Sequence, residues 1–286
     1  MDEDDYSDPR WIDHRLEVRA YLGGGATSRV YEGYDHPHAR EVAIKIARVG
    51  LDKKTLQRLE REVVALRAVH HRNVVGVLDH GQLPDGRPYV VMQRIFGRPL
   101  LDVLFDRPGQ RMPWQEAVPL ALDLLDALGA MHRSGVVHRD VKPANVLVTE
   151  HQGPVLVDLG FAQLEDAGPR LTPDGRVVGT PGFIPPEVLM GRRPAGPSAD
   201  VYAMGVMMFQ MLVGQLPFSG ALSEMIVSIM SGPRPSLTAL VPDLPPTIAA
   251  IVDRAMARDP RARFQDADGM AWTTREALGK LATEQL

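Results

Sequence analysis

The segment Val136–Val148, VVHRDVKPANVLV, places polar side chains between two short apolar runs. The apolar runs are typical of short buried strands, so the residues between them form a loop packed against the interior. A buried polar side chain costs free energy unless it pairs with another side chain, a metal or a substrate. We therefore treat the polar residues of this loop as candidates for chemistry: His138, Arg139, Asp140, Lys142 and Asn145.

Three further motifs carry residues suited to phosphate and metal. The glycines of LGGGATSRVY, residues 22–31, allow backbone N–H groups to approach phosphate oxygens. Lys45 stands in the apolar strand pattern VAIK, where it needs an anion such as Glu62 or a phosphate. Asp158 ends the apolar run VLVD, and with Asn145 it offers the oxygen ligands that Mg²⁺ prefers. Taken singly, these motifs also fit a glycine turn, a solvated lysine and a turn-capping carboxylate.

Composition limits the classes of function. The chain has 286 residues, of which 44% are hydrophobic, and a net charge of −4, so no basic face points to nucleic acid. The absence of cysteine excludes disulfides, thiolate metal sites and cysteine nucleophiles, and it fits a reducing, cytoplasmic location. No apolar run approaches about 18 residues, so we expect no membrane contact from this chain itself.

The predicted elements change from strands to helices along the chain. Apolar and β-branched patterns predict strands, with one helical pattern at 53–69 between them; the strands are 16–22, 29–35, 40–47, 73–81 and 87–95. Beyond Gly97 helices dominate, at 114–135 and at 198–214, and the second is apolar on nearly all sides. We expect the acidic residues 1–14 to form a solvated tail.

The order of these motifs, GGGATS, VAIK, HRDVKPAN, DLG and PPE, resembles the protein kinase signature over residues 15–280. The similarity is greatest to the eukaryotic-like Ser/Thr kinases of bacteria. It implies an α+β, bilobal protein kinase fold, in which a small β-rich N-lobe carries one regulatory helix and the larger C-lobe is mainly helical. The implied division is a tail at 1–14 and a catalytic domain at 15–284, with N-lobe 15–92, hinge 93–97 and C-lobe 98–284.

The resemblance also assigns catalytic roles. Asp140 would accept the proton of the substrate hydroxyl, and Lys142, which marks Ser/Thr kinases, would lie near the transferred phosphate. Lys45 would hold the α- and β-phosphates of ATP and pair with Glu62. Thr180 would steady Asp140 and Lys142 from the peptide-docking segment.

The cofactor-binding residues follow from the same resemblance. Asn145 and Asp158 would hold Mg²⁺, with Mn²⁺ as an alternative. The remaining residues would surround the phosphates and the adenine of ATP: Leu22, Gly23, Gly24, Gly25, Ala26, Thr27, Ser28, Val30, Ala43, Met92, Gln93, Ile95 and Leu147.

Two structural links are implied as well, and the sequence departs from the family pattern at three positions. Asp200 would hold the backbone of His138 and Arg139, and Glu187 would pair with Arg263. The departures are Ser28 at the third glycine position of the phosphate turn, Leu159 in place of phenylalanine, and Pro185 in place of alanine.

The implied function is transfer of the γ-phosphate of ATP to Ser or Thr hydroxyls of protein substrates in signalling. A pseudokinase that only binds partners is the first alternative, and the presence of Lys45, Glu62, Asp140, Asn145 and Asp158 argues against it. A small-molecule kinase is the second alternative. The sequence VVGTPGFIPPE argues against that one, because small-molecule kinases of this fold usually lack such a peptide-docking segment.

A control site is expected between Asp158 and Glu187, where Thr172 and Thr180 are the only Ser or Thr residues. Thr180 is assigned to the docking segment, which leaves Thr172 as the candidate phosphosite. Phosphate there would add about −1.5 to −2 charges that pair with Arg139. The expected source is autophosphorylation between molecules, through a transient homodimer. The alternative is an unmodified Thr172 and an Arg139 that pairs with a neighbouring carboxylate.

Overall fold

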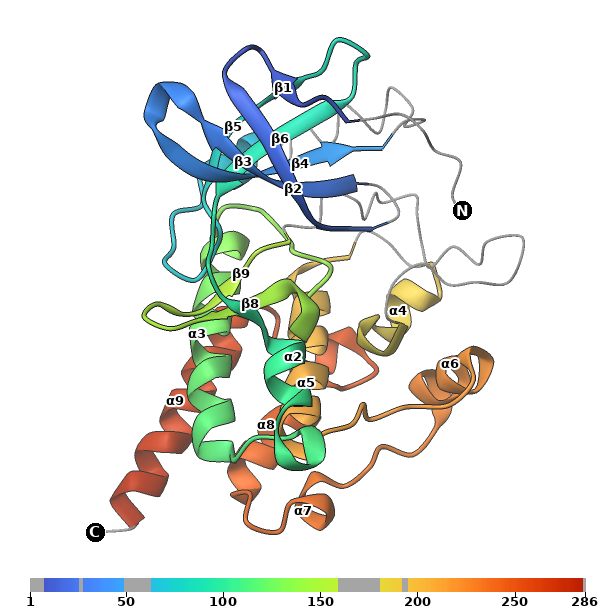
Figure 1. The fold of residues 1–286 in the computed structure, drawn as a ribbon. Helices are drawn as coiled ribbons and strands as arrows, with labels where there is room; N and C mark the ends of the chain where they lie inside the picture. The colour runs from blue at the N-terminus through green and yellow to red at the C-terminus, as the bar shows by residue number, and fades with distance from the viewer. Residues whose placement is uncertain (1–7, 26–27, 49–62, 159–180, 192–194, 285–286) are drawn as a thin grey trace. The chain divides into compact units, whose positions relative to one another are not determined.

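The protein is described from a computed structural model, shown in Figure 1, for residues 8–25, 28–48, 63–158, 181–191 and 195–284. Its contacts divide the chain into two compact units. The first unit comprises Met1–Arg67 and Val75–Ile95, and the second comprises Ala68–Val74 and Phe96–Leu286. In the described part of the chain, no helix is both long enough and apolar enough to cross a membrane.

The first unit is built on a six-stranded antiparallel sheet with the order β1-β2-β3-β4-β6-β5. Its strands are β1 (Trp11–Ile12), β2 (Leu16–Gly24), β3 (Ser28–Asp35), β4 (Arg40–Ala47), β5 (Val77–Gln82) and β6 (Pro88–Gln93), with the 3₁₀ helix η1 (His36–His38) after β3. The strands predicted from the alternating patterns are therefore present.

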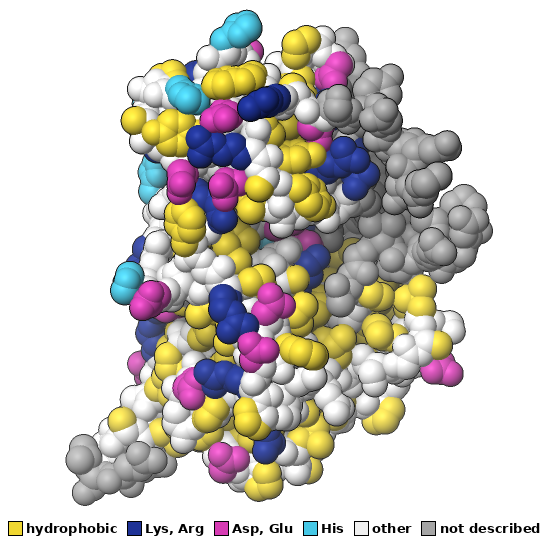
Figure 2. All heavy atoms as spheres, in the orientation of Figure 1, with side chains coloured by type: hydrophobic (Ala, Val, Ile, Leu, Met, Phe, Trp, Pro, Cys, Tyr) yellow, Lys and Arg dark blue, Asp and Glu magenta, His cyan; other side chains and the backbone are white. Residues whose placement is uncertain are grey.

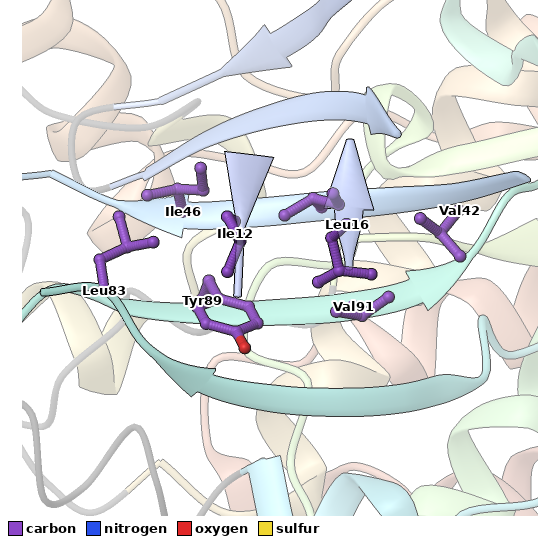
Figure 3. Close-up of a cluster of buried hydrophobic side chains, with 8 residues drawn as sticks. Ile12, Leu16, Val42, Ile46, Leu83, Tyr89 and Val91 are labelled. Carbon is purple, nitrogen blue, oxygen red and sulfur yellow. The ribbon is translucent and has the colours of Figure 1, made fainter. Parts of the chain in front are cut away.

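The two faces of this sheet differ because successive side chains of a strand point to opposite sides. Tyr31 pairs with Ile44, which pairs with Val91, and this face carries the hydrophobic core. Figure 3 shows that core, which consists of Ile12, Leu16, Val42, Ile44, Ile46, Leu83, Tyr89 and Val91. Val30 pairs with Lys45, so these two side chains lie on the opposite face.

Within residues 8–14, Trp11–Ile12 form β1, and the side chains of Asp8 and Ile12 are buried, which differs from the solvated tail expected over 1–14. β1 pairs with β2 through Trp11 and Ile12, and Ile12 is only 2% exposed. The side chain of Asp8 is also buried. Acidic composition pointed to solvent, but one buried isoleucine and partnered carboxylates outweigh that tendency.

The segment 68–74 belongs to the second unit, although the N-lobe was expected to run without interruption over 15–92. Asn73 Nδ2 donates to the carbonyl of Pro154 at 2.6 Å, and the N–H of Leu156 donates to the carbonyl of Asn73 at 2.9 Å. Before this segment, residues 63–67 are helical, and the rest of the helix predicted at 53–69 lies outside the described residues.

The second unit is mainly helical and contains a small sheet, β7-β8-β9. Its strands and α-helices are β7 (Arg98–Pro99), α2 (Leu100–Phe105), α3 (Trp114–Arg133), β8 (Val146–Thr149), β9 (Gly153–Leu156), α4 (Pro186–Leu189), α5 (Pro197–Val213), α6 (Leu222–Ser231), α7 (Leu237–Leu240), α8 (Pro246–Ala255) and α9 (Ala267–Glu284). Short 3₁₀ helices are η2 (Pro108–Gln110), η3 (Pro143–Asn145), η4 (Pro181–Phe183) and η5 (Pro260–Ala262).

Helix α5 is the centre of the second unit. It is buried along almost its whole length, as its apolar sequence predicts, and α3, α8 and α9 pack against it. Gly205 allows α8 to approach closely, because a Cβ at this position would lie 2.9 Å from side-chain atoms of Ala255 and Met256. On the face shown in Figure 2, basic and acidic side chains are interspersed, in keeping with exposed ion pairs such as Arg98–Asp106.

Asp200, in the first turn of α5, holds the loop that follows α3. Its side chain has no exposed surface and accepts hydrogen bonds from the backbone N–H groups of His138 at 2.8 Å and Arg139 at 2.7 Å. His132 Nε2 lies 2.9 Å from the same carboxylate. Arg139 has a φ of 66°, which is rare for a residue with a side chain, so these bonds hold a strained backbone in place.

We predict that Asp200→Asn lowers the free energy of unfolding by about 1–3 kcal/mol, because the new amide N–H faces a backbone N–H in a buried site. Denaturant titration measures this value. The control is Asp268→Asn, since Asp268 is 46% exposed and pairs with the exposed Arg133, a pair worth less than about 1 kcal/mol. Equal losses in the two variants would contradict the role of Asp200.

Candidate functional site

The structure brings together three of the polar residues in the loop between α3 and β8. Lys142 Nζ donates to Asp140 Oδ2 at 2.7 Å, and Asn145 Nδ2 donates to the same oxygen at 2.8 Å. Asn145 Nδ2 also lies 2.8 Å from the backbone carbonyl of Asp140. The side chain of Asp140 stays 24% exposed, so its carboxylate is held by neighbours and remains accessible to a substrate.

The same loop explains how polar side chains are accommodated between apolar strands. His138 is buried, and its Nδ1 accepts a hydrogen bond from the N–H of Asp140 at 3.3 Å. Asp200 accepts from the backbone of His138 and Arg139. Local partners therefore offset the burial of these groups, while Asp140 and Lys142 keep exposed surface.

Asp158 and Asn145 lie on adjacent segments and offer oxygen atoms to a metal. The N–H of Val157 donates to the carbonyl of Asn145 at 3.1 Å, so Asp158, two residues after the end of β9, directly follows this contact. Asn145 is 6% exposed, and because its amide nitrogen donates to Asp140, its amide oxygen is left as an acceptor.

This pair fits a hard divalent cation that brings further ligands with it. Among the described residues, no group of three or more His, Asp or Glu side chains is arranged to hold a metal ion. Mg²⁺ commonly uses one or two protein oxygens and completes its shell with water and phosphate oxygens. The residues present therefore fit Mg²⁺ bound together with a nucleotide better than a metal held by protein ligands alone.

In the first unit, the sheet face opposite the hydrophobic core carries Lys45. Val30 lies directly opposite Lys45, and Ala43 lies opposite Met92, so these four side chains share one face. Lys45 is only 5% exposed. This face places the apolar side chains of Val30, Ala43 and Met92 beside Lys45, which suits a flat apolar ring that carries an anionic group.

The glycine-rich turn between β2 and β3 closes through its backbone. The N–H of Gly25 donates to the carbonyl of Ser28 at 3.0 Å, and Arg48 Nε donates to the carbonyl of Gly25 at 3.0 Å. A Cβ on Gly24 would lie 2.7 Å from the Ser28 carbonyl oxygen, so only glycine fits there without a backbone shift. The turn thus brings backbone groups closer together than other residues allow.

Strand β6 ends at Gln93, and the backbone groups of residues 93–95 make hydrogen bonds outside the sheet. The N–H of Gln93 donates to the carbonyl of Gly76 at 2.8 Å. Arg94 Nη1 donates to the carbonyl of Ile95 at 2.7 Å, and Arg94 Nη2 lies 3.5 Å from Glu32. Arg94 was not predicted from the sequence, because no local pattern signals a side chain that donates to its neighbour's carbonyl.

The predicted site residues are distributed over both units. The first unit holds the glycine turn, β3, β4 and β6 positions, namely Leu22, Gly23, Gly24, Gly25, Ser28, Val30, Ala43, Lys45, Met92, Gln93 and Ile95. The second unit holds Asp140, Lys142, Asn145, Leu147 and Asp158. The described residues do not include Ala26, Thr27, Glu62, Leu159, Thr172 and Thr180.

The predicted ion pair between Glu187 and Arg263 is present. Arg263 Nη1 and Nη2 donate to the two carboxylate oxygens at 2.8 and 2.7 Å, and the Arg263 side chain has no exposed surface. Its guanidinium also donates to the carbonyls of Ala257 and Ser198, at 2.6 and 3.1 Å. Because Nε, Nη1 and Nη2 of Arg263 all have acceptors, the pair anchors α4, which follows η4, to the segment before α9.

His132 is a positioning residue that the sequence analysis missed. It lies in the last turn of α3, and its ring joins Asp200 to the N–H of Ala267, which lies 3.3 Å from Nδ1. One ring therefore links α3, α5 and α9. Its spacing from His138 carries no recognised motif, so only the tertiary contacts identify it.

Known proteins resemble this chain over most of its length. The protein kinase domain family matches residues 16–272. A relative from Corynebacterium glutamicum, named probable serine/threonine-protein kinase PknB, is 36% identical over 273 residues, with 91% of this chain and 42% of that protein covered. Serine/threonine-protein kinase PknL of Mycobacterium bovis is 36% identical over 263 residues, with coverages of 91% and 64%.

Solved structures show the same likeness. A crystal structure of the Mycobacterium tuberculosis PknI kinase domain matches with a TM-score of 0.71 and 26% identity, covering 91% of this chain and 95% of that one. The chain spans 42% and 64% of the length of the two relatives named above. The family match extends from β2 into α9 and includes every described site residue, and the chain therefore belongs to the protein kinase family.

Proposed function

We propose that this chain transfers the γ-phosphate of ATP to Ser and Thr hydroxyls of protein substrates. The observation that carries the proposal is the contact of Asp140 with both Lys142 and Asn145, on a loop fixed by Asp200. Relatives that are named serine/threonine-protein kinases support the same substrate class.

In the proposed reaction the oxygen of the substrate hydroxyl attacks the γ-phosphorus of ATP. The bond from that phosphorus to the β–γ bridging oxygen breaks, and ADP leaves with the electron pair. The accessible carboxylate of Asp140 accepts the hydroxyl proton, and Lys142 offers positive charge beside it. Positioning and electrostatic stabilisation supply most of the catalysis in such reactions.

The nucleotide and metal have separate proposed sites. Lys45 would bind phosphate from the sheet of the first unit, and Val30, Ala43 and Met92 would contact adenine on the same face. Asn145 and Asp158 would hold Mg²⁺, which neutralises phosphate charge when bound. The presence of Lys45, Asn145 and Asp158 together with Asp140 argues against a binding module without catalysis.

We predict that Asp140→Asn reduces kcat by about 10²–10⁴-fold, because the amide accepts no proton at neutral pH. Transfer of labelled phosphate from ATP to a generic basic protein measures the rate, and calorimetry should show unchanged ATP binding. Asp243→Asn, an exposed carboxylate on the loop between α7 and α8, is the control and should retain full activity. Near-normal turnover by pure Asp140→Asn enzyme would rule out this assignment.

Removal of the metal should abolish the reaction. We predict no transfer in excess chelator, and recovery on addition of Mg²⁺ or Mn²⁺, because the oxygens of Asn145 and Asp158 suit hard cations. Asp158→Ala should lose the Mg²⁺-dependent part of nucleotide affinity, while affinity in the absence of metal stays at the parent value. Full activity in excess chelator would contradict the metal site.

Thr172 is proposed, from the sequence alone, as the site of activating autophosphorylation. Mass spectrometry of ATP-treated protein should find phosphate there, and Thr172→Ala should remain less active than the parent after preincubation with ATP. Thr172→Ser, which keeps a hydroxyl, is the matched control. Inactive Asp140→Asn protein should become phosphorylated when mixed with the parent if transfer occurs between molecules. If fully active enzyme carries no phosphate on Thr172, activation by phosphorylation of Thr172 is disproved.

A further inference from the structure

We propose that Asp8 is a positioning residue for the glycine-rich turn, of which the structure describes residues 22–25 and 28, and that it acts through Arg29 and Tyr31 on β3. This inference rests on the proposed role of the turn in binding nucleotide phosphates. It adds a residue outside the chemical site to the determinants of nucleotide affinity.

The carboxylate of Asp8 joins two separate parts of the first unit. Its Oδ1 accepts from Arg87 Nη1 at 2.5 Å, in the turn between β5 and β6. Its Oδ2 accepts from Arg29 Nη1 at 3.3 Å and from the hydroxyl of Tyr31, both on β3. We call Asp8, Arg29, Tyr31 and Arg87 the Asp8 clasp.

At the centre of the clasp, Asp8 and Arg87 are buried, while Arg29 is 27% exposed at its side chain. Asp8 is 5% exposed and Arg87 10% exposed at the side chain. Asp85 accepts from Arg87 Nε at 2.7 Å and so orients the guanidinium toward Asp8. Burial alone raises the pKa of Asp8, but hydrogen bonds from Tyr31, Arg87 and Arg29 bring its pKa below the usual value. Asp8 is therefore ionised at neutral pH, and charge-assisted bonds of this kind are strong.

Both β3 residues of the clasp lie next to the glycine-rich turn. Arg29 directly follows Ser28, whose carbonyl closes the turn on Gly25, and it pairs in register with Gly24. The ring of Tyr31 contacts Tyr21 on β2, with centroids 5.7 Å apart. The clasp thus fixes the strand that leaves the turn and, through Tyr21, the strand that enters it.

The clasp holds the side of β3 that faces away from Lys45. Arg29 and Tyr31 alternate with Val30, and Val30 lies opposite Lys45 on the other face. Asp8 therefore sits behind the strand whose other face carries the proposed nucleotide contacts. It has no direct part in the chemistry, and any effect on nucleotide must pass through the position of β3 and the turn.

A turn rich in glycine loses much conformational freedom when it becomes ordered on a ligand. Fixing its flanking strand in advance reduces that loss and raises affinity. Removing Asp8 should therefore weaken nucleotide binding and leave the rate at saturating nucleotide almost unchanged, since Asp140 and Lys142 belong to the other unit.

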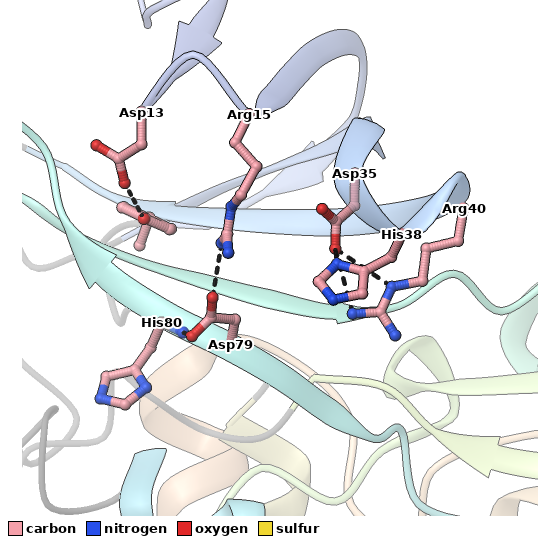
Figure 4. A network of polar contacts seen from close by, with 8 residues as sticks. Asp13, Arg15, Asp35, His38, Arg40, Asp79 and His80 are labelled. Atoms are coloured by element: carbon pink, nitrogen blue, oxygen red, sulfur yellow. Dashed lines mark hydrogen bonds and ion pairs between the residues drawn. The ribbon is translucent and has the colours of Figure 1, made fainter.

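The same sheet offers a matched control. Arg15 Nη2 donates to Asp79 Oδ2 at 2.6 Å, as Figure 4 shows, and this pair also links the β2–β3 hairpin to β5. Arg15 directly precedes β2, and Leu16 pairs with Asp35 at the far end of β3 from the glycine turn. Asp79→Ala breaks an ion pair of the same sheet that is more exposed than the Asp8–Arg87 pair, with side chains of Arg15 and Asp79 at 28% and 36%, and it should not disturb the turn.

The test compares the parent with Asp8→Ala, Tyr31→Phe and Asp79→Ala. The readouts are the KM for ATP, kcat with a protein substrate, the affinity for ADP with Mg²⁺, Tm, and hydrogen exchange of residues 18–31. Asp8→Ala should raise KM and the ADP Kd about 5-fold with kcat within about 2-fold, and exchange in 18–31 should become faster. Tyr31→Phe should raise KM about 2-fold, and Asp79→Ala should lower Tm at unchanged KM.

Equal KM values for Asp8→Ala and Asp79→Ala, with unchanged exchange in residues 18–31, would overturn the inference. If Asp8→Ala does not fold, Tyr31→Phe decides, because it removes one hydroxyl and keeps the ring. Asp8→Glu, which keeps the charge, should recover part of the nucleotide affinity that Asp8→Ala loses. If Asp8→Glu raises Tm relative to Asp8→Ala without raising affinity, the inference is also overturned. A parent that binds no nucleotide would refute the proposed function, and exchange at the turn would still decide whether Asp8 orders it.

Discussion

The buried carboxylate of Asp200 is the interaction on which the catalytic loop depends. A charge without exposed surface is tolerated only when several donors surround it, and here two backbone N–H groups and one imidazole do so. Because α5 is packed on nearly all sides, Asp200 is held rigidly, and it holds Arg139 at a φ of 66° in turn. Asp140 follows immediately, so a helix at the centre of the second unit sets the place of the proposed base.

The two units position their proposed site residues by different means. In the first unit, strand alternation alone separates a hydrophobic face from a face that presents Lys45. In the second unit, a loop has no such periodicity, so its polar groups are fixed one by one by hydrogen bonds to Asp200, His138 and Asn145. The proposed site therefore depends on sheet geometry in one unit and on a network of buried polar contacts in the other.

Ion pairs in this protein differ greatly in what they do. Exposed pairs such as Arg133–Asp268 and Arg275–Asp126 join α3 to α9 and contribute little to stability. Arg263 of the Glu187–Arg263 pair has no exposed surface, so loss of Glu187 would leave a buried charge without its carboxylate partner. Asp8 is of this second kind, although it lies at the edge of the chain in sequence. How deeply an ion pair is buried therefore distinguishes pairs that position a site from pairs that lie exposed on the surface.

The sequence by itself determined the strands of the first unit, the buried helix α5 and the loop that brings Asp140, Lys142 and Asn145 together. These features depend on local periodicity or on spacings of a few residues, and both can be read directly from the sequence. Only the tertiary structure decided that Trp11–Ile12 join the sheet, that 68–74 belong to the second unit, and that His132 links three helices. Asp8 meets Arg87, and Asn73 meets Pro154, across 79 and 81 positions of the chain. Partners so distant leave no local pattern, because their contact exists only after the intervening chain has folded.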